Sequence, residues 1–170
     1  KTIPELVKLA KSRPGQLNYG SVGVGSSNHL GIALLNIMAG TDMLHIPYKG
    51  TAPVMTDLMA GRVQLMLNSM GTVIQHVRSG KLVGLAVGTL TRSPAAPDIP
   101  TMDEIGYKGY QVSTWYAFFA PAKPPAPVIN RLNTVAGQVL REESMIKTLV
   151  PQGFDSTPST PEAIGRQMRE

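Results

Sequence analysis

The chain has 170 residues, of which 42% are hydrophobic, and its formal net charge is +5. This length and composition suit one domain, or one domain and part of another, with a buried core. The absence of cysteine excludes disulfides, thiolate catalysis and cysteine-based metal sites. The basic residues are dispersed and only 5% of the residues are aromatic, which argues against a nucleic-acid-binding surface and suits a small anionic ligand.

The first half of the chain alternates helix-like and strand-like segments. Thr2 and Glu5 have the spacing of a capping box, which predicts a helix that runs to about Ser12. Gly40 stands where a left-handed helix cap is expected. The hydrophobic pattern predicts strands at 17–22, 43–48, 63–68 and 83–90, and helices at 30–38, 51–60 and 72–79. Short connections between alternating strands and helices imply a parallel sheet covered by helices, so the predicted class is α/β.

The regular alternation stops in the second half of the chain. Ser93–Pro100 is a proline-rich surface connection, and the capping-box spacing of Thr101 and Glu104 predicts a short helix after it. The remaining pattern predicts an apolar strand at 110–120, an amphipathic helix at 128–142 and a last helix that begins after Thr160.

The segment NYGSVGVGSSNHL, residues 18–30, joins the first predicted strand to the next helix through glycine and serine. The first amides of a helix lack intrahelical partners and carry partial positive charge, so such a loop suits an anion. No Asp, Glu, Lys or Arg lies between Gln16 and Thr41. An anion would therefore be held by backbone amides and by the side chains of Ser21, Ser26, Ser27, Asn28 or His29. The alternative is a tight turn in which Ser26 or Ser27 is an ordinary helix N-cap.

Interpretations of this loop as an enzyme site fit the sequence poorly. A nucleoside-triphosphate loop ends in Gly-Lys-Ser/Thr, whereas two serines follow Gly25 directly. A dinucleotide fingerprint would use Gly23 and Gly25, but Asn28 occupies the third glycine position. No nucleophile elbow surrounds Ser27, and the three histidines lack the spacing of metal ligands. The sequence thus predicts no catalytic residue, no metal and no cofactor.

Three side chains with rings have two interpretations each. His29 is either an ordinary surface or core histidine or part of the site, because it falls on the first helical turn, where the helix dipole disfavours its cation. Tyr48 ends a predicted strand, so its hydroxyl either reaches a ligand or caps the sheet edge. Trp115 either lines a hinge or packs between domains.

Several motifs together resemble the solute receptors of tripartite tricarboxylate transporters, also called the Bug family. The motifs are the glycine loop, the Pro-Tyr-Lys-Gly turn at 47–50, the Arg-Ser-Pro and Pro-Asp-Ile-Pro stretch at 92–100, and the predicted strand that contains Trp115. The resemblance runs almost from end to end, and the order and spacing of its motifs make it specific.

This resemblance implies a periplasmic, non-catalytic receptor with a type II periplasmic-binding-protein-like fold, in which two α/β domains are joined by crossing strands. Such receptors close on a small organic acid and deliver it to a membrane permease. The ligand would be a dicarboxylate, a tricarboxylate, an aromatic acid or an acidic amino acid. Two alternatives stay open: a receptor that signals to a sensor protein, and an α/β enzyme that uses the loop for an anionic substrate.

The resemblance also implies a domain assignment. Residues 1–109 would form the second α/β domain, and residues 110–170 would return to the first. The family has an earlier segment that forms most of the first domain, and nothing before Lys1 corresponds to it. Apolar side chains that would face this segment, Val112, Phe118 and Phe119, are therefore expected to be exposed.

The resemblance assigns the family's ligand loop residue by residue to Ser21, Gly23, Gly25, Ser26, Ser27 and Asn28. After the third strand the family usually has an aspartate, and this chain has Asn68 at that position. An asparagine offers both a donor and an acceptor but no charge. The replacement leads to the hypothesis that the preference shifts from ligands with an amino group toward purely anionic ones. Tyr48 and His29 complete the set of candidate ligand contacts.

Overall fold

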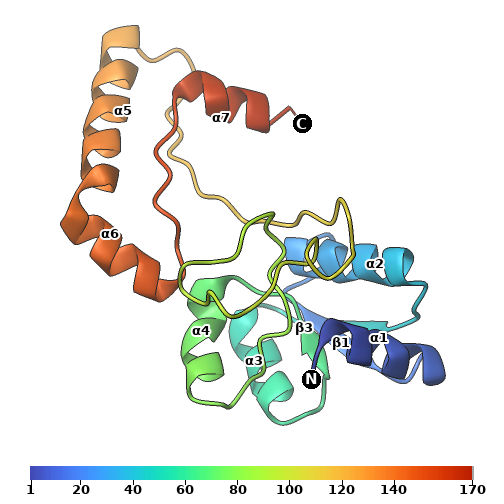
Figure 1. Cartoon of the computed structure of the whole chain (residues 1–170). Coiled ribbons are helices and arrows are strands. Elements are labelled where there is room, and N and C mark those ends of the chain that lie inside the picture. Colours follow the sequence, from blue (N-terminus) through green and yellow to red (C-terminus); the bar gives the residue numbers. More distant parts are fainter. Residues whose placement is uncertain (170) are drawn as a thin grey trace. The chain divides into compact units, whose positions relative to one another are not determined.

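The computed structural model describes residues 1–169 and divides into two units, 1–114 and 115 onward, which we describe separately. The first unit contains α1 (Ile3–Ser12), β1 (Asn18–Ser21), α2 (Ser27–Ala39), β2 (Leu44–Pro47), α3 (Thr51–Met59), β3 (Leu65–Met66) and α4 (Met70–Arg78) (Figure 1). The second contains α5 (Ala126–Arg141), α6 (Glu143–Leu149), a 3-10 turn at Val150–Gln152 and α7 (Pro161–Gln167).

The sheet of the first unit has three parallel strands in the order β2-β1-β3. β1 is central: Tyr19 lies opposite His45 of β2 and opposite Leu65 of β3. The helices between the strands make each connection a crossover, as a parallel sheet requires. The predicted α/β class and its first three strands are confirmed.

Successive residues of β1 face opposite sides of the sheet. Tyr19 packs in the main core, which α1 and α2 supply with residues such as Ala10 and Ile32. Gly20 faces the other side, where Val54 of α3 is fully buried. The backbone of β1 is therefore covered on both faces, which fixes where its carboxyl end lies.

Two predicted helix ends in the first unit, the start of α1 and the close of α2, are confirmed. The Thr2 hydroxyl accepts a hydrogen bond from the Glu5 amide (3.3 Å), and the Glu5 carboxylate accepts one from the Thr2 amide (2.9 Å). Gly40 closes α2 in the left-handed conformation, with φ 62° and ψ 49°. Both signals are local in sequence, which is why they could be identified without a fold.

The strand predicted at 83–90 is wrong. This segment forms only one isolated parallel bridge, between Val87 and Thr101. The Val87 amide donates to the Pro100 carbonyl (2.9 Å), while the Gly88 carbonyl accepts from the Val112 amide (2.9 Å). The segment is apolar enough for a strand, but its hydrogen bonds are shared between two different loops and no ladder forms.

The strand predicted at 110–120 is also wrong, because among the described residues no strand pairs with this segment and unpaired backbone groups do not form a strand. Val112 packs against the core, contrary to the expectation that it is exposed. Phe118 and Phe119 are exposed as expected, by 94% and 67%. Apolar sequence alone did not distinguish a packed residue from an exposed one.

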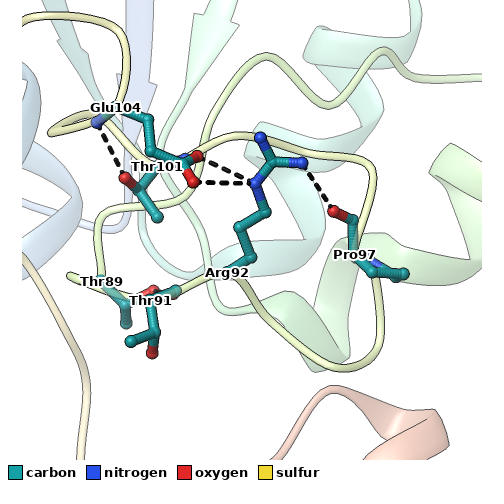
Figure 2. A network of polar contacts seen from close by, with 6 residues as sticks. All are labelled: Thr89, Thr91, Arg92, Pro97, Thr101 and Glu104. Atoms are coloured by element: carbon teal, nitrogen blue, oxygen red, sulfur yellow. Dashed lines mark hydrogen bonds and ion pairs between the residues drawn. The ribbon is translucent and has the colours of Figure 1, made fainter.

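The short helix predicted after Thr101 is wrong, although its capping hydrogen bonds exist. The Thr101 amide donates to the Glu104 carboxylate (2.8 Å), and the Glu104 amide donates to the Thr101 hydroxyl (3.0 Å). Figure 2 shows that the same carboxylate accepts from Nε of Arg92 (2.9 Å), whose guanidinium also donates to the Pro97 carbonyl (3.0 Å). The bond to Thr101 and the charge of Arg92 lower the pKa of Glu104. The capping box closes the proline-rich loop instead of starting a helix.

The second unit is helical. Thr160 caps α7 by accepting from the Ala163 amide (3.2 Å), as predicted. The helix predicted at 128–142 is found as α5, but α6 was not predicted. Glu142 is extended (φ −66°, ψ 135°) between the two helices. No glycine or proline marks this break in the sequence, so the helical pattern gave no sign of it.

We predict that Gly20→Ala destabilises the protein through Val54. A Cβ on Gly20 would lie 2.3 Å from a Val54 methyl carbon, so the side chains must shift, at a cost of about 1–3 kcal/mol. Val54→Ala alone destabilises by leaving a cavity. The double variant should cost clearly less than the sum of the two single changes, because the new methyl fills the space that the valine vacates. Urea unfolding measures all three variants, and additive costs would contradict the close approach.

We predict that Tyr110→Phe has a pH-dependent effect. The buried hydroxyl donates to the Gly31 carbonyl (3.0 Å), and burial raises the pKa of Tyr110 to about 12. A tyrosine in the unfolded chain has a pKa of about 10. The stability that the neutral hydroxyl contributes is therefore complete below about pH 10 and is lost as the pH rises toward about 12. The variant should lose about 1 kcal/mol at neutral pH and show a shallower alkaline loss.

Denaturant unfolding from neutral to alkaline pH tests this expectation. Tyr116→Phe is the matched control, because Tyr116 is 74% exposed and should leave both quantities unchanged. An alkaline slope in Tyr110→Phe equal to that of the wild type would contradict the assignment.

Candidate functional site

The carboxyl ends of the three parallel strands meet at one edge of the sheet. The loop after β1 contains the glycine and serine residues, the loop after β2 begins at Tyr48, and the loop after β3 contains Asn68. In open α/β sheets, ligands bind outside this edge. The fold thus brings the sequence-predicted candidates, from three separate segments, to the edge where a binding site is expected.

The glycine loop, residues 22–26, is held by the hydroxyl groups of Ser21 and Ser26. The Ser21 hydroxyl is fully buried and hydrogen-bonds both the Gly23 amide (3.1 Å) and the Gly23 carbonyl (3.0 Å). The Ser26 hydroxyl donates to the same carbonyl (2.7 Å). Gly23 and Gly25 have φ values of 140° and 80°, which other residues rarely adopt. The loop conformation therefore depends on glycine for its shape and on two hydroxyls for its rigidity.

The start of α2, which follows this loop, has backbone amides without hydrogen-bond partners among the described residues. Ser26 is the N-cap, since its hydroxyl accepts from the His29 amide (3.4 Å). Ser27 is exposed, and within residues 1–169 the amides of Ser27 and Asn28 have no hydrogen-bond acceptor. The two sequence interpretations are thus compatible: one serine caps the helix, and the next residues leave amides available to an anion.

Two asparagines connect this region to β3. The Asn28 side chain is buried and donates to the Leu67 carbonyl, which ties the start of α2 to the loop after β3. The Asn68 oxygen accepts from the Ser69 amide (2.8 Å), and its amide group faces the sulfurs of Met66 (3.6 Å) and Met55 (3.9 Å). Asn68 therefore lies in a partly buried, mostly apolar environment.

The Tyr48 hydroxyl donates to the Asp57 carboxylate (2.8 Å), which also pairs with Arg62 (2.7 Å). The bond to Asp57 raises the pKa of Tyr48, and the bonds from Arg62 and Tyr48 lower the pKa of Asp57. Tyr48 is thus anchored to α3, an arrangement that fits the sheet-edge interpretation. Its contact with a ligand stays a prediction.

A stack of rings that the sequence did not predict lies behind the loop. The imidazoles of His29 and His45 are 4.0 Å apart, and Tyr19 stacks on His45 at 5.1 Å. Nδ1 of His29 accepts from the Gly25 amide (3.2 Å), and Nε2 of His45 lies 2.6 Å from the Ser21 hydroxyl. Burial, and then the charge of His29, lower the pKa of His45. The pairing of Tyr19 with His45 across two strands could have indicated this stack, but it can be recognised only when the strand register is known.

Other kinds of site are not found in the part of the chain that the structure describes. No three His, Cys, Asp or Glu side chains there form a group that could hold a metal ion. No helix among residues 1–169 is long and apolar enough to cross a bilayer.

Comparison with known proteins identifies the family. A family model, the tripartite tricarboxylate transporter family receptor, matches residues 1–166. The chain belongs to this family. A relative from Pseudomonas sp. (strain P51), the UPF0065 protein in the tcbD-tcbE intergenic region, is 35% identical over 165 residues, which cover 96% of this chain and 49% of the relative. The chain spans about half the length of the curated relatives it matches.

Two similar solved structures support the same conclusion. R. palustris Rpa4515 with adipate has a TM-score of 0.91 and 31% identity, over 99% of this chain and 56% of that chain. The periplasmic binding protein BugD has a TM-score of 0.85 and 34% identity, over 99% and 57%. The predicted Bug-family membership and periplasmic-binding-protein-like class are confirmed, and the family consists of solute-binding receptors, not enzymes. The roles of individual site residues stay predictions.

Proposed function

We propose that this chain forms the glycine-loop part of a periplasmic receptor that captures a small organic carboxylate and delivers it to a tripartite transporter permease. The observation that carries the proposal is the start of α2: open amides and an exposed serine above a loop that is rigid before any ligand arrives. The matched family supports the transport role. The relative solved with adipate supports a carboxylate as the ligand class.

The chemistry of the loop fits one carboxylate group. Backbone amides and a hydroxyl donate hydrogen bonds, and the helix dipole adds partial positive charge. The first turn of α2 contains no acidic residue that would repel an anion. Without an arginine in the loop, the bond lacks a bidentate charged clamp, which suits a receptor that must also release its ligand.

The rest of the ligand would be held by other parts of the receptor. Because the chain covers only about half of its relatives, we propose that residues 1–109 are the second α/β domain and that residues 110–170 return to the first. A dicarboxylate would then bind with one end on this loop and the other on the first domain. Domain closure around the bound acid would form the surface that the permease reads.

Thermal denaturation of the full-length protein tests the proposal. We expect one of adipate, succinate, malate, citrate, benzoate or glutamate to raise the melting temperature and to be recovered chemically unchanged by mass spectrometry. Ser27→Ala should leave the melting temperature of the free protein unchanged and weaken binding, because the exposed hydroxyl has no structural partner among the described residues.

Ser26→Ala is the matched comparison. It removes the N-cap and a bond to Gly23, so it should also lower the free energy of unfolding of the free protein by about 1 kcal/mol. The melting temperature of the free protein should fall accordingly. If both variants changed the melting temperature of the free protein and the ligand affinity to the same extent, this would argue against a ligand at Ser27. Conversion of the bound acid, or no stabilisation by any acid, would overturn the receptor proposal.

A second prediction concerns Asn68. We expect Asn68→Asp to raise the affinity for aspartate relative to succinate, because a carboxylate at this position attracts an ammonium group and repels a second anion. Isothermal titration with both acids measures the ratio. Asn28→Asp is the control, because Asn28 is a buried asparagine whose side chain has a backbone partner. This variant should lower the affinity for both ligands to a similar extent. An unchanged ratio in Asn68→Asp would contradict the hypothesis.

A further inference from the structure

The ring stack of Tyr19, His29 and His45 is connected to the glycine loop at two points. One is the hydrogen bond from the Gly25 amide to Nδ1 of His29 (3.2 Å), and the other is the contact of Nε2 of His45 with the Ser21 hydroxyl (2.6 Å). These three side chains come from β1, α2 and β2, so the stack joins three elements directly beneath the loop.

The bond at Gly25 defines the protonation state of His29. A ring nitrogen that accepts an amide hydrogen bond has no proton, so His29 is neutral and carries its proton on Nε2. An imidazolium has donors on both nitrogens and no acceptor. Protonation of His29 therefore breaks this bond and places an N–H group against the Gly25 amide.

The contact at Ser21 links the second ring to the same loop. The Ser21 hydroxyl hydrogen-bonds the Gly23 backbone, so the contact with Nε2 of His45 reaches Gly23 through Ser21. His29 therefore contacts the loop directly at Gly25, and His45 contacts it through Ser21.

The stack disfavours positive charge. Two imidazoles 4.0 Å apart repel each other when both are protonated. The titratable groups in contact with the pair are Tyr19 from β1 and the two rings themselves, from α2 and β2. Among the described residues, no carboxylate hydrogen-bonds or pairs with either ring, so no anion compensates a proton gained there.

We propose that His29, stacked on His45, is a positioning residue that holds the glycine loop in its anion-binding shape only while the His29 ring is neutral, so that the receptor binds its acid more weakly in mildly acid solution. This inference rests on the proposed function. A charged His29 would attract an anion, but the ring becomes charged only when its bond to Gly25 is broken. The geometry therefore favours weaker binding at low pH.

The direct test is the affinity of the full-length protein for adipate, measured by isothermal titration between about pH 7.5 and about pH 5.5. Because binding would require the loss of one proton from the imidazole, the affinity should fall toward low pH by at most about tenfold per pH unit. An affinity that is constant, or that rises toward low pH, overturns the proposal.

Matched variants separate the histidines from the ligand's own titration. In His29→Asn the side-chain oxygen replaces Nδ1 as the acceptor for Gly25, so binding at neutral pH should survive with a much smaller pH dependence. His29→Ala lacks the acceptor and should bind weakly at all pH values. His76, the third histidine, lies in α4, and His76→Asn should keep the full wild-type pH dependence. If His29→Asn keeps the full dependence, the proposal is wrong.

A ligand-free measurement distinguishes failure of this inference from failure of the proposed function. Nitrogen-15 NMR of the imidazoles should show His29 as the Nε2–H tautomer at neutral pH, and the Gly25 amide resonance should shift as His29 titrates. If no acid binds at any pH, the proposed function fails, and this experiment alone decides. A His29 that is protonated on Nδ1 at neutral pH, or a Gly25 resonance that ignores its titration, overturns the positioning role.

Discussion

The pairing of β1 with a strand on each side is the constraint on which the site depends. β1 shares four register pairs with β2 and two with β3, and both pairings are parallel. Since the three strands end at one edge, the loops after them meet there. Gly20 permits this arrangement, because the backbone of β1 approaches the buried Val54 too closely for any larger residue. The packing on both faces of one short strand thus determines where the proposed anion site lies.

The proposed site would bind an anion with groups that carry no formal charge. The donors left for an anion are two backbone amides and one exposed hydroxyl. Hydrogen bonds of the neighbouring loop, at Gly23 and Ser26, hold the backbone that carries them. A rigid loop does not lose conformational freedom when the ligand arrives, which is a cost that flexible sites must overcome. The histidine stack contacts the same region, at the Gly25 amide and at the Ser21 hydroxyl.

Local sequence signals predicted what depends on neighbours in the chain. The capping box of Thr2, the left-handed Gly40 and the glycine loop all follow from a few consecutive residues. Segments whose structure depends on distant partners were predicted wrongly: 83–90 and 110–120 have the composition of strands, but their backbone groups find no ladder in the described chain. The histidine stack was missed for the same reason, because the contact between His29 and His45 exists only after the strands pair.

The three serines in and beside the glycine loop show why residue type alone cannot assign a role. Ser21 is the last residue of β1, so its side chain is buried and stabilises the loop from within. Ser26 precedes α2 and caps it, whereas Ser27 lies on the first turn and faces solvent. A ligand can meet only the last of these hydroxyls without rearrangement of the loop. The other two contribute by keeping the amides in place, so their loss should lower the stability of the ligand-free protein.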